Sequence, residues 1–235
     1  MSTGKLLRKV VRGMMISAGA VGVYLRFVRP WLMNHGATDL EIQRSLPGDT
    51  QVKHPLWTST QAITIHATPS EIWPWLAQWG YERGGFYSYD WVDRLVGAHG
   101  LISSDLILPQ FQNIQPGDWV PVSKSGGFVV RDMEKDCFIL LENRLDLQTA
   151  QQIPDHTRLP ETYVHMTWLW YLQPLDEKRT RLISRIWFDT RYQPSLPGSL
   201  FMGELLKPGS AIMDWRMLRG IKCRTEGSCL AANDA

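Results

Sequence analysis

The chain of 235 residues is 44% hydrophobic and 20% charged, an ordinary globular composition that suits one main domain with a substantial core. Its 25 Lys and Arg residues nearly balance its 23 Asp and Glu residues, and outside the N-terminus the charges are interspersed. The domain therefore lacks the basic surface that nucleic acid requires, and we expect no nucleic-acid partner.

The first 33 residues differ from the rest because basic residues flank an apolar run over residues 13–25. A bilayer crossing needs about 20 residues, so a span over residues 10–33 is marginal. A helix in the membrane interface fits at least as well, since Phe27 and Trp31 suit that boundary, and a helix packed on the domain remains open. We expect residues 1–33 to form an apolar helix that associates with a membrane and leaves the domain in an aqueous compartment.

The remaining chain divides into three parts. Residues 34–56 are polar and rich in turn formers, which predicts a linker or a segment that wraps the domain. Residues 57–226 carry the periodic apolar patterns of one domain, and residues 227–235 are expected to be a disordered tail.

The domain begins with a strand that leads directly into a helix. β-Branched residues alternate over residues 62–66, and Thr68-Pro69-Ser70-Glu71 has the form of a capping box. The helix that follows is expected to end at Gly80 and to bend at Pro74. A second, short helix fits residues 89–96. Five further extended segments cover residues 118–122, 127–133, 138–143, 163–173 and 180–192.

Alternation assigns the faces of the last two strands. Asp176-Glu177-Lys178 predicts a hairpin between them, so they should pair antiparallel. The residues expected to face the core are Val164, Met166, Trp168, Trp170, Leu172, Leu182, Ser184, Ile186 and Phe188.

A long amphipathic helix is expected to begin near Ser210. Asp214 lies largely off its apolar stripe, which consists of Ala211, Ile212, Trp215, Leu218 and Ile221. The stripe must be buried, and the concave face of the sheet is the available surface. The order of elements therefore predicts an α+β fold in which a curved antiparallel sheet wraps around a long C-terminal helix.

Several motifs resemble the START-like superfamily called SRPBCC, in particular its bacterial branch with an N-terminal apolar segment. They are the stretches 62–69, 71–76 and 83–91, with further matches at 36–39 and 217–222. The resemblance covers nearly the whole chain. It implies a helix-grip fold with a deep hydrophobic cavity, which the superfamily uses for lipid transfer, hormone sensing, polyketide cyclisation and coenzyme chaperoning. It implies no single set of catalytic residues.

A ligand site is expected where aromatic and polar groups gather. The segment that follows Gly84-Gly85 is predicted to form the mouth of the cavity, and the inner faces of the strands and of the last helix are predicted to line it. The predicted ligand-binding residues are Arg83, Phe86, Tyr87, Tyr89, Trp91, Met166, Trp168, Trp170, Ile186, Phe188 and Trp215. The alternative is that these aromatics fill the core and that Asp90 caps a helix.

Binding of a hydrophobic small molecule or lipid is favoured over catalysis, because the expected lining is apolar. The alternative is a cyclase or dehydratase in which Asp90 or Tyr87 moves a proton. A purely structural or partner-binding module is the third hypothesis. Nothing in the spacing of Glu142, His165 and Asp214 brings them together, so we expect each to be structural.

The three cysteines show neither a CxxC motif nor the spacing of a zinc site. Reduced thiols are therefore expected at Cys137, Cys223 and Cys229. No motif in the chain requires a metal or a cofactor, and we expect neither.

Overall fold

The computed structural model describes residues 19, 21–95, 97–155, 157–192 and 206–228. Six strands form one antiparallel sheet in the order β1-β6-β5-β4-β3-β2. The strands are β1 (Trp57–Ile65), β2 (Trp119–Pro121), β3 (Gly127–Glu134), β4 (Phe138–Asp146), β5 (Tyr163–Asp176) and β6 (Arg179–Arg191). The expected hairpin is confirmed, because Asp176 pairs with Arg179 across a tight turn. At the other edge of β6, Trp57 pairs with Phe188.

The helices lie before, between and after the strands. They are η1 (Tyr24–Val28), α2 (Arg29–Met33), α3 (Asp39–Gln43), α4 (Pro69–Ala77), α5 (Asp90–Leu95), η2 (Pro109–Phe111) and α7 (Leu206–Thr225). Glu71 accepts a 2.7 Å hydrogen bond from the Thr68 backbone amide, so the expected capping interaction is present. α7 begins earlier than expected and has Pro208 in its first turn. Proline lacks a backbone N–H, but the N–H groups of a first turn have no acceptor within the helix, so no hydrogen bond is lost.

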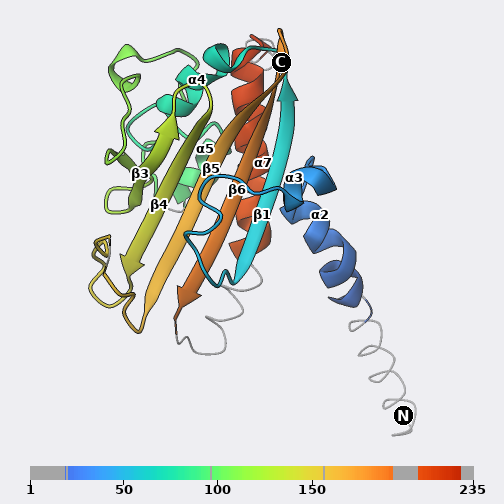
Figure 1. Ribbon diagram of the computed structural model, residues 1–235. Helices are drawn as coiled ribbons and strands as arrows, with labels where there is room; N and C mark the ends of the chain where they lie inside the picture. Colours follow the sequence, from blue (N-terminus) through green and yellow to red (C-terminus); the bar gives the residue numbers. More distant parts are fainter. Residues whose placement is uncertain (1–18, 20, 96, 156, 193–205, 229–235) are drawn as a thin grey trace, which may run out of the picture.

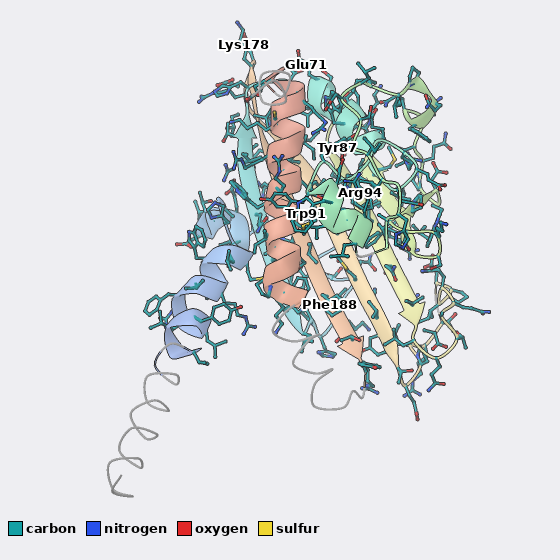
Figure 2. The ribbon with its side chains drawn as sticks, turned by 180° about the vertical axis from the view of Figure 1, so that it is seen from behind. Glu71, Tyr87, Trp91, Arg94, Lys178 and Phe188 are labelled. Carbon is teal, nitrogen blue, oxygen red and sulfur yellow. The ribbon has the colours of Figure 1, made fainter. Side chains whose placement is uncertain are left out.

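α7 lies along one face of the sheet, as an α+β helix-grip arrangement requires (Figures 1 and 2). The strand faces follow the predicted alternation. Trp170, Leu172 and Leu182 pack in the core cluster that contains Met217, Leu218 and Ile221 of α7. Ile186 and Phe188 pack with Ala211 further along the helix.

The rotation of α7 about its axis differs from the expectation. Ile212 is 46% exposed, although it was placed on the buried stripe, and Asp214 is only 3% exposed. The buried side is formed by Ala211, Asp214, Met217, Leu218 and Ile221. The physical reason is that Asp214 has a hydrogen-bond partner on β6, Ser184, so the carboxyl group can be buried.

The segment before β1 covers the opposite face of the sheet, where it crosses the strands (Figure 1). Leu46 packs on Leu140, Leu169 and Ile183. Arg185 on β6, which is 2% exposed, holds this segment on the sheet through hydrogen bonds. Its Nη1 lies 2.7 Å from Asp49 Oδ2 and also donates to the Arg44 carbonyl. Its Nη2 donates to the carbonyls of Glu41 and Ile42. Its Nε donates to Thr60 Oγ1 on β1.

The expected apolar helix of residues 1–33 falls largely outside the described residues. The described end of this segment, η1 and α2, is helical (Figures 1 and 2). The end of α2 packs on the domain, where Met33 joins Trp57, Phe188 and Ala211, and η1 leads away from it. Within the described parts of the chain, no helix combines the length and the apolar character that a membrane crossing requires. Most of the expected tail, residues 229–235, also lies outside the described residues.

The cysteines depart from expectation at one position. Cys137 is a free thiol, but Cys223 is disulfide-bonded. Reduced thiols were expected because the spacing matched no known motif, and spacing alone does not determine whether two sulfur atoms meet in the fold.

The Arg185 contacts predict a large effect on stability. Arg185→Met removes the cationic partner of Asp49 and a donor to three carbonyl groups, so we expect urea unfolding to show a loss of about 3–5 kcal/mol. Arg179→Met is the matched control, because its partner Asp176 is exposed, and it should leave the free energy of unfolding nearly unchanged. Equal losses in the two variants would contradict this role for Arg185.

Candidate functional site

A cavity of about 200 Å³ lies between α7, α5 and the inner face of β5 and β6. Several side chains on its rim, such as Val122, Met166 and Met213, are only half-buried, so solvent reaches it. The lining residues are Trp79, Phe86, Ser88, Asp93, Val122, Met166, Trp168, Ile186, Ser210, Met213, Asp214 and Met217. A cavity of about 150 Å³ holds benzene, and sites for drug-sized molecules begin at about 300 Å³. This cavity therefore has room for a molecule of one or two rings.

Aromatic side chains form one wall of the cavity. Trp168 projects inward from β5, and its ring centroid lies 5.1 Å from that of Trp79 in an edge-to-face arrangement. The centroid of Phe86 lies 5.0 Å from that of Trp79 on the other side. Trp170 supports the two tryptophans from behind, at 5.0 and 5.2 Å. Such contacts favour a rigid wall, which offers the cavity both ring faces and ring edges.

Asp214 is the most deeply buried polar group of the cavity. Trp168 Nε1 donates to Ser184 Oγ at 2.8 Å, and Ser184 Oγ donates to Asp214 Oδ1 at 2.9 Å. Asp214 Oδ2 is buried and has no hydrogen-bond partner among the described residues. Burial raises the pKa of Asp214 to about 7, against a smaller opposing effect of the Ser184 hydrogen bond.

A second carboxyl group lines the same cavity. Asp93 on α5 accepts a hydrogen bond from Ser88. Burial, together with the negative charge of Asp90, raises the pKa of Asp93 to about 6, although the Ser88 hydrogen bond opposes the shift. The cavity thus combines an apolar, aromatic lining with two carboxyl groups that bind protons near neutral pH, which is a combination found at functional sites.

The structure brings together four of the predicted ligand-binding residues, namely Phe86, Met166, Trp168 and Ile186. Trp170 and Phe188 are buried on the same face of the sheet but do not line the cavity.

The other residues predicted at the mouth lie outside the cavity. Tyr89 and Trp215 line a shallow groove beside α2, and Trp91 is 65% exposed on α5, next to α7 (Figure 2). Arg83 donates to the carbonyls of Ala77 and Trp79, so it caps the end of α4. The segment 83–91 therefore contributes Phe86 and Ser88 to the cavity rather than a complete mouth.

Asp90 and Tyr87, the predicted proton carriers, do not line the cavity. Both oxygens of Asp90 accept hydrogen bonds from Ser103, at 2.6 Å from the hydroxyl and 2.9 Å from the backbone amide. Tyr87 is fully buried, and burial raises the pKa of its hydroxyl. Its backbone touches Gly220 of α7 so closely that a Cβ atom there would lie 2.0 Å from the Tyr87 carbonyl oxygen. Both residues hold the loop against its neighbours.

Glu142 and His165, whose spacing along the chain offers no reason to bring them together, form a pair in the structure. Adjacent strands place them on the outer face of the sheet, where His165 Nε2 lies 2.8 Å from Glu142 Oε1 and both side chains are buried. Arg131 approaches the other oxygen of Glu142 at 3.4 Å. Spacing along one strand does not reveal a pair across two strands, because the pairing depends on their register. Asp214 lies on the opposite face, so the three residues form no common site.

The sequence contained a partial signal for the two residues that it missed. Asp214 lies three residues after Ala211 and four before Leu218, which places it on the same side of a helix as both. Asp93 lies in the first turn of a short helix. Acidic residues are common at that position because the helix dipole stabilises their negative charge, so Asp93 did not indicate a site. Only the packed structure shows that both side chains are buried. Among the described residues, no group of His, Cys, Asp or Glu could hold a metal ion.

No protein-family model and no curated protein matches the sequence. The solved structures that it resembles include a protein from Mesorhizobium loti (14% identity, TM-score 0.40, covering 73% of this chain and 98% of that one). A conserved protein from Geobacillus kaustophilus has 9% identity and a TM-score of 0.34, covering 73% of this chain and 97% of that one. An aromatase/cyclase from Streptomyces sp. R1128 has 16% identity and a TM-score of 0.30, covering 75% of this chain and 97% of that one. TM-scores this low carry no argument about this chain.

The raised pKa of Asp214 predicts that stability depends on pH. The native state keeps the proton up to about pH 7, whereas an unfolded Asp loses it near pH 4, so stability falls as pH rises through this window. Asp214→Asn removes the ionisation and keeps an acceptor for Ser184. Urea unfolding at pH 8 should therefore show the variant to be more stable than the wild type, by on the order of a few kcal/mol.

The stability advantage of Asp214→Asn should shrink toward pH 4, where the wild-type carboxyl is also neutral. A smaller decline with pH should remain in the variant, because Asp93 still ionises. Asp39→Asn, at an exposed position, is the control and should follow the wild-type profile. Parallel profiles for the wild type and Asp214→Asn would show that Asp214 is not buried as described.

Proposed function

We propose that the protein binds a small, largely apolar molecule, preferably aromatic, in the cavity between α7 and the sheet. The observation that carries this proposal is the open cavity of about 200 Å³. A cavity with aromatic walls and a few polar groups matches the chemistry of small-molecule sites.

The sequence resemblance to the SRPBCC superfamily supports the same proposal. The helix-grip arrangement that this resemblance implies agrees with the six-stranded antiparallel sheet and the C-terminal helix. We propose that the chain is a START-like protein on these two grounds. The small size of the cavity favours a compact ligand over a complete two-chain lipid, because the lining leaves room for only one or two rings.

A ligand screen tests this function. Mass spectrometry of gently extracted protein should reveal a bound hydrophobic compound, and one- and two-ring aromatic compounds should raise the melting temperature. Val122→Phe, at the half-buried rim, should fill part of the cavity and abolish these shifts.

Leu175→Phe serves as the matched control, because Leu175 is exposed near the β5–β6 turn and should not affect binding. The proposal fails if no compound is retained and no aromatic compound shifts the melting temperature. It also fails if Val122→Phe folds normally and binds like the wild type.

An enzyme that uses general acid–base chemistry is the second candidate. The raised pKa values of Asp93 and Asp214, about 6 and 7, favour it, because groups that exchange protons near neutral pH suit proton transfer. The same compounds discriminate the two functions. An enzyme changes the mass or structure of a compound during incubation, and Asp214→Asn slows that change, whereas a binding protein returns the compound unaltered.

We further propose that the protein is associated with a membrane and that its domain lies in an aqueous compartment. Several large apolar side chains are exposed on the described end of the N-terminal segment, among them Val21, Phe27 and Trp31. Arg26 lies beside them, with its guanidinium 5.5 Å from the Phe27 ring centroid. Exposed apolar side chains with neighbouring arginines suit the headgroup boundary of an anionic bilayer.

Vesicle flotation tests the membrane proposal. The full chain should float with vesicles that contain phosphatidylglycerol, and replacing both Phe27 and Trp31 by Glu should reduce the floated fraction several-fold, because charge opposes insertion. Leu40→Glu is the control, since Leu40 is even more exposed than Phe27 and Trp31 but lies on α3. Equal floated fractions of the double variant and the wild type would contradict the membrane proposal.

A further inference from the structure

The hydrogen bonds behind the cavity have a fixed direction. An indole nitrogen only donates, so Ser184 Oγ accepts from Trp168 Nε1 at 2.8 Å. Asp214 Oδ1, 2.9 Å away, is the one acceptor that the described residues offer to the Ser184 hydroxyl, so the hydroxyl donates its own hydrogen there. Oδ1 therefore acts as an acceptor, and a proton on the Asp214 carboxyl group resides on Oδ2.

Two polar atoms of the cavity lining have no hydrogen-bond partner among the described residues, Asp214 Oδ2 and Trp79 Nε1. The indole N–H of Trp79 keeps its hydrogen at every pH tested, so of the two only Asp214 makes ligand binding depend on pH. The Ser88 hydroxyl donates to Asp93, and the Ser210 hydroxyl donates to the Lys207 carbonyl at 2.9 Å. Both hydrogens are thus engaged within the protein. Asp214 is 3% exposed, lines the cavity and leaves Oδ2 without a partner among the described residues. An unpaired buried polar atom costs free energy, which a ligand can recover.

We propose that Asp214, as a neutral carboxylic acid, donates a hydrogen bond from Oδ2 to a carbonyl oxygen of the bound molecule. The ligand class is accordingly a small aromatic ketone or aldehyde. This inference rests on the proposed function, because it requires the cavity to be the binding site. It goes further by naming the polar group of the ligand and the atom that recognises it.

The charges around the cavity agree with a neutral donor. Asp93 is the other titratable residue in its lining, and no basic side chain is among the lining residues, so an anionic ligand finds no partner there. Arg185 and His165, on the strands beneath, face the opposite side of the sheet, where they contact Asp49 and Glu142. On α7 itself, Lys207 is buried but does not line the cavity, and the Arg216 guanidinium lies 5.5 Å from the Tyr89 ring centroid.

The preference for an acceptor follows from burial. Desolvation favours the uncharged carboxyl group, which raises the pKa of Asp214 to about 7. A neutral acid with Oδ1 already accepting has a donor to offer, and a carbonyl oxygen is the complementary group. An organic cation would instead require Asp214 to ionise inside the protein.

Acetophenone and ethylbenzene form a matched pair of probes, because they have similar shape but only the ketone accepts a hydrogen bond. Dissociation constants for the full chain are measured by NMR titration at pH 5.5 and pH 8.5. Acetophenone should bind about 3- to 10-fold more tightly than ethylbenzene at pH 5.5, the range expected for one net hydrogen bond. The preference should shrink at pH 8.5, where Asp214 has lost its proton.

Two substitutions of Asp214 distinguish the effect of hydrogen-bond donation from the effect of the carboxylate charge. In Asp214→Asn, the amide oxygen accepts from Ser184 and the amide nitrogen donates to the ketone, so the preference should persist at both pH values. Asp214→Leu lacks the donor at this position, so its preference for acetophenone should be weaker than in the wild type at pH 5.5 and should not change with pH. Asp39→Asn, at an exposed position outside the cavity, is the control and should keep the wild-type pH dependence. The infrared carbonyl stretch of bound acetophenone should move to lower frequency in the wild type and in Asp214→Asn.

The outcomes are distinguishable. If neither probe binds to the wild type, the cavity is not a site for such molecules and the proposed function falls together with this inference. If ethylbenzene binds as tightly as acetophenone, or if the preference does not change with pH, binding stands and the role of Asp214 is overturned. If Asp214→Leu does not fold, the pH-independent preference of Asp214→Asn still decides the question.

Discussion

The hydrogen bond between Ser184 and Asp214 determines how α7 is rotated on the sheet. A carboxyl group is buried only where its hydrogen bonds can be satisfied, and Ser184 supplies one on the inner face of β6. With this contact made, Met217 and Leu218 turn toward the core and Ile212 turns toward solvent. The space beside Asp214 remains open because Trp168 donates to Ser184, which holds its ring at the wall of the cavity instead of over it.

The other face of the sheet is closed by a different kind of contact. Arg185 reaches the carbonyls and the carboxylate of a segment that precedes β1, and Leu46 fills the adjacent apolar surface. The buried pair of Glu142 and His165 lies on that face as well. Both faces are therefore covered, and the two faces differ in chemistry. Hydrogen bonds and ion pairs of polar side chains hold the outer layer, whereas aromatic packing beside the buried Asp214 shapes the inner one.

Alternation and turn chemistry predicted the strands well. The hairpin at Asp176 and the inward faces of Trp168 and Ile186 follow from local pattern, because side chains in a strand alternate wherever one face is buried. The rotation of α7 was not predictable from polarity, since a buried Asp contradicts the rule that charged residues face water. The pairing of Glu142 with His165 and the burial of Asp93 depend on register and loop packing, which no periodicity encodes.

The pairing of Trp57 with Phe188 has a consequence for how the chain is made. Ribosomes add about 5–20 residues per second, so β1 emerges on the order of ten seconds before its partner β6 exists. During that interval β1 has an unpaired backbone, which is a template for unwanted association. The hairpin of β5 and β6 is local and can form as soon as it is synthesised. The first strand of the domain is thus among the last to be paired, so its backbone stays open to association with other chains until β6 has been synthesised.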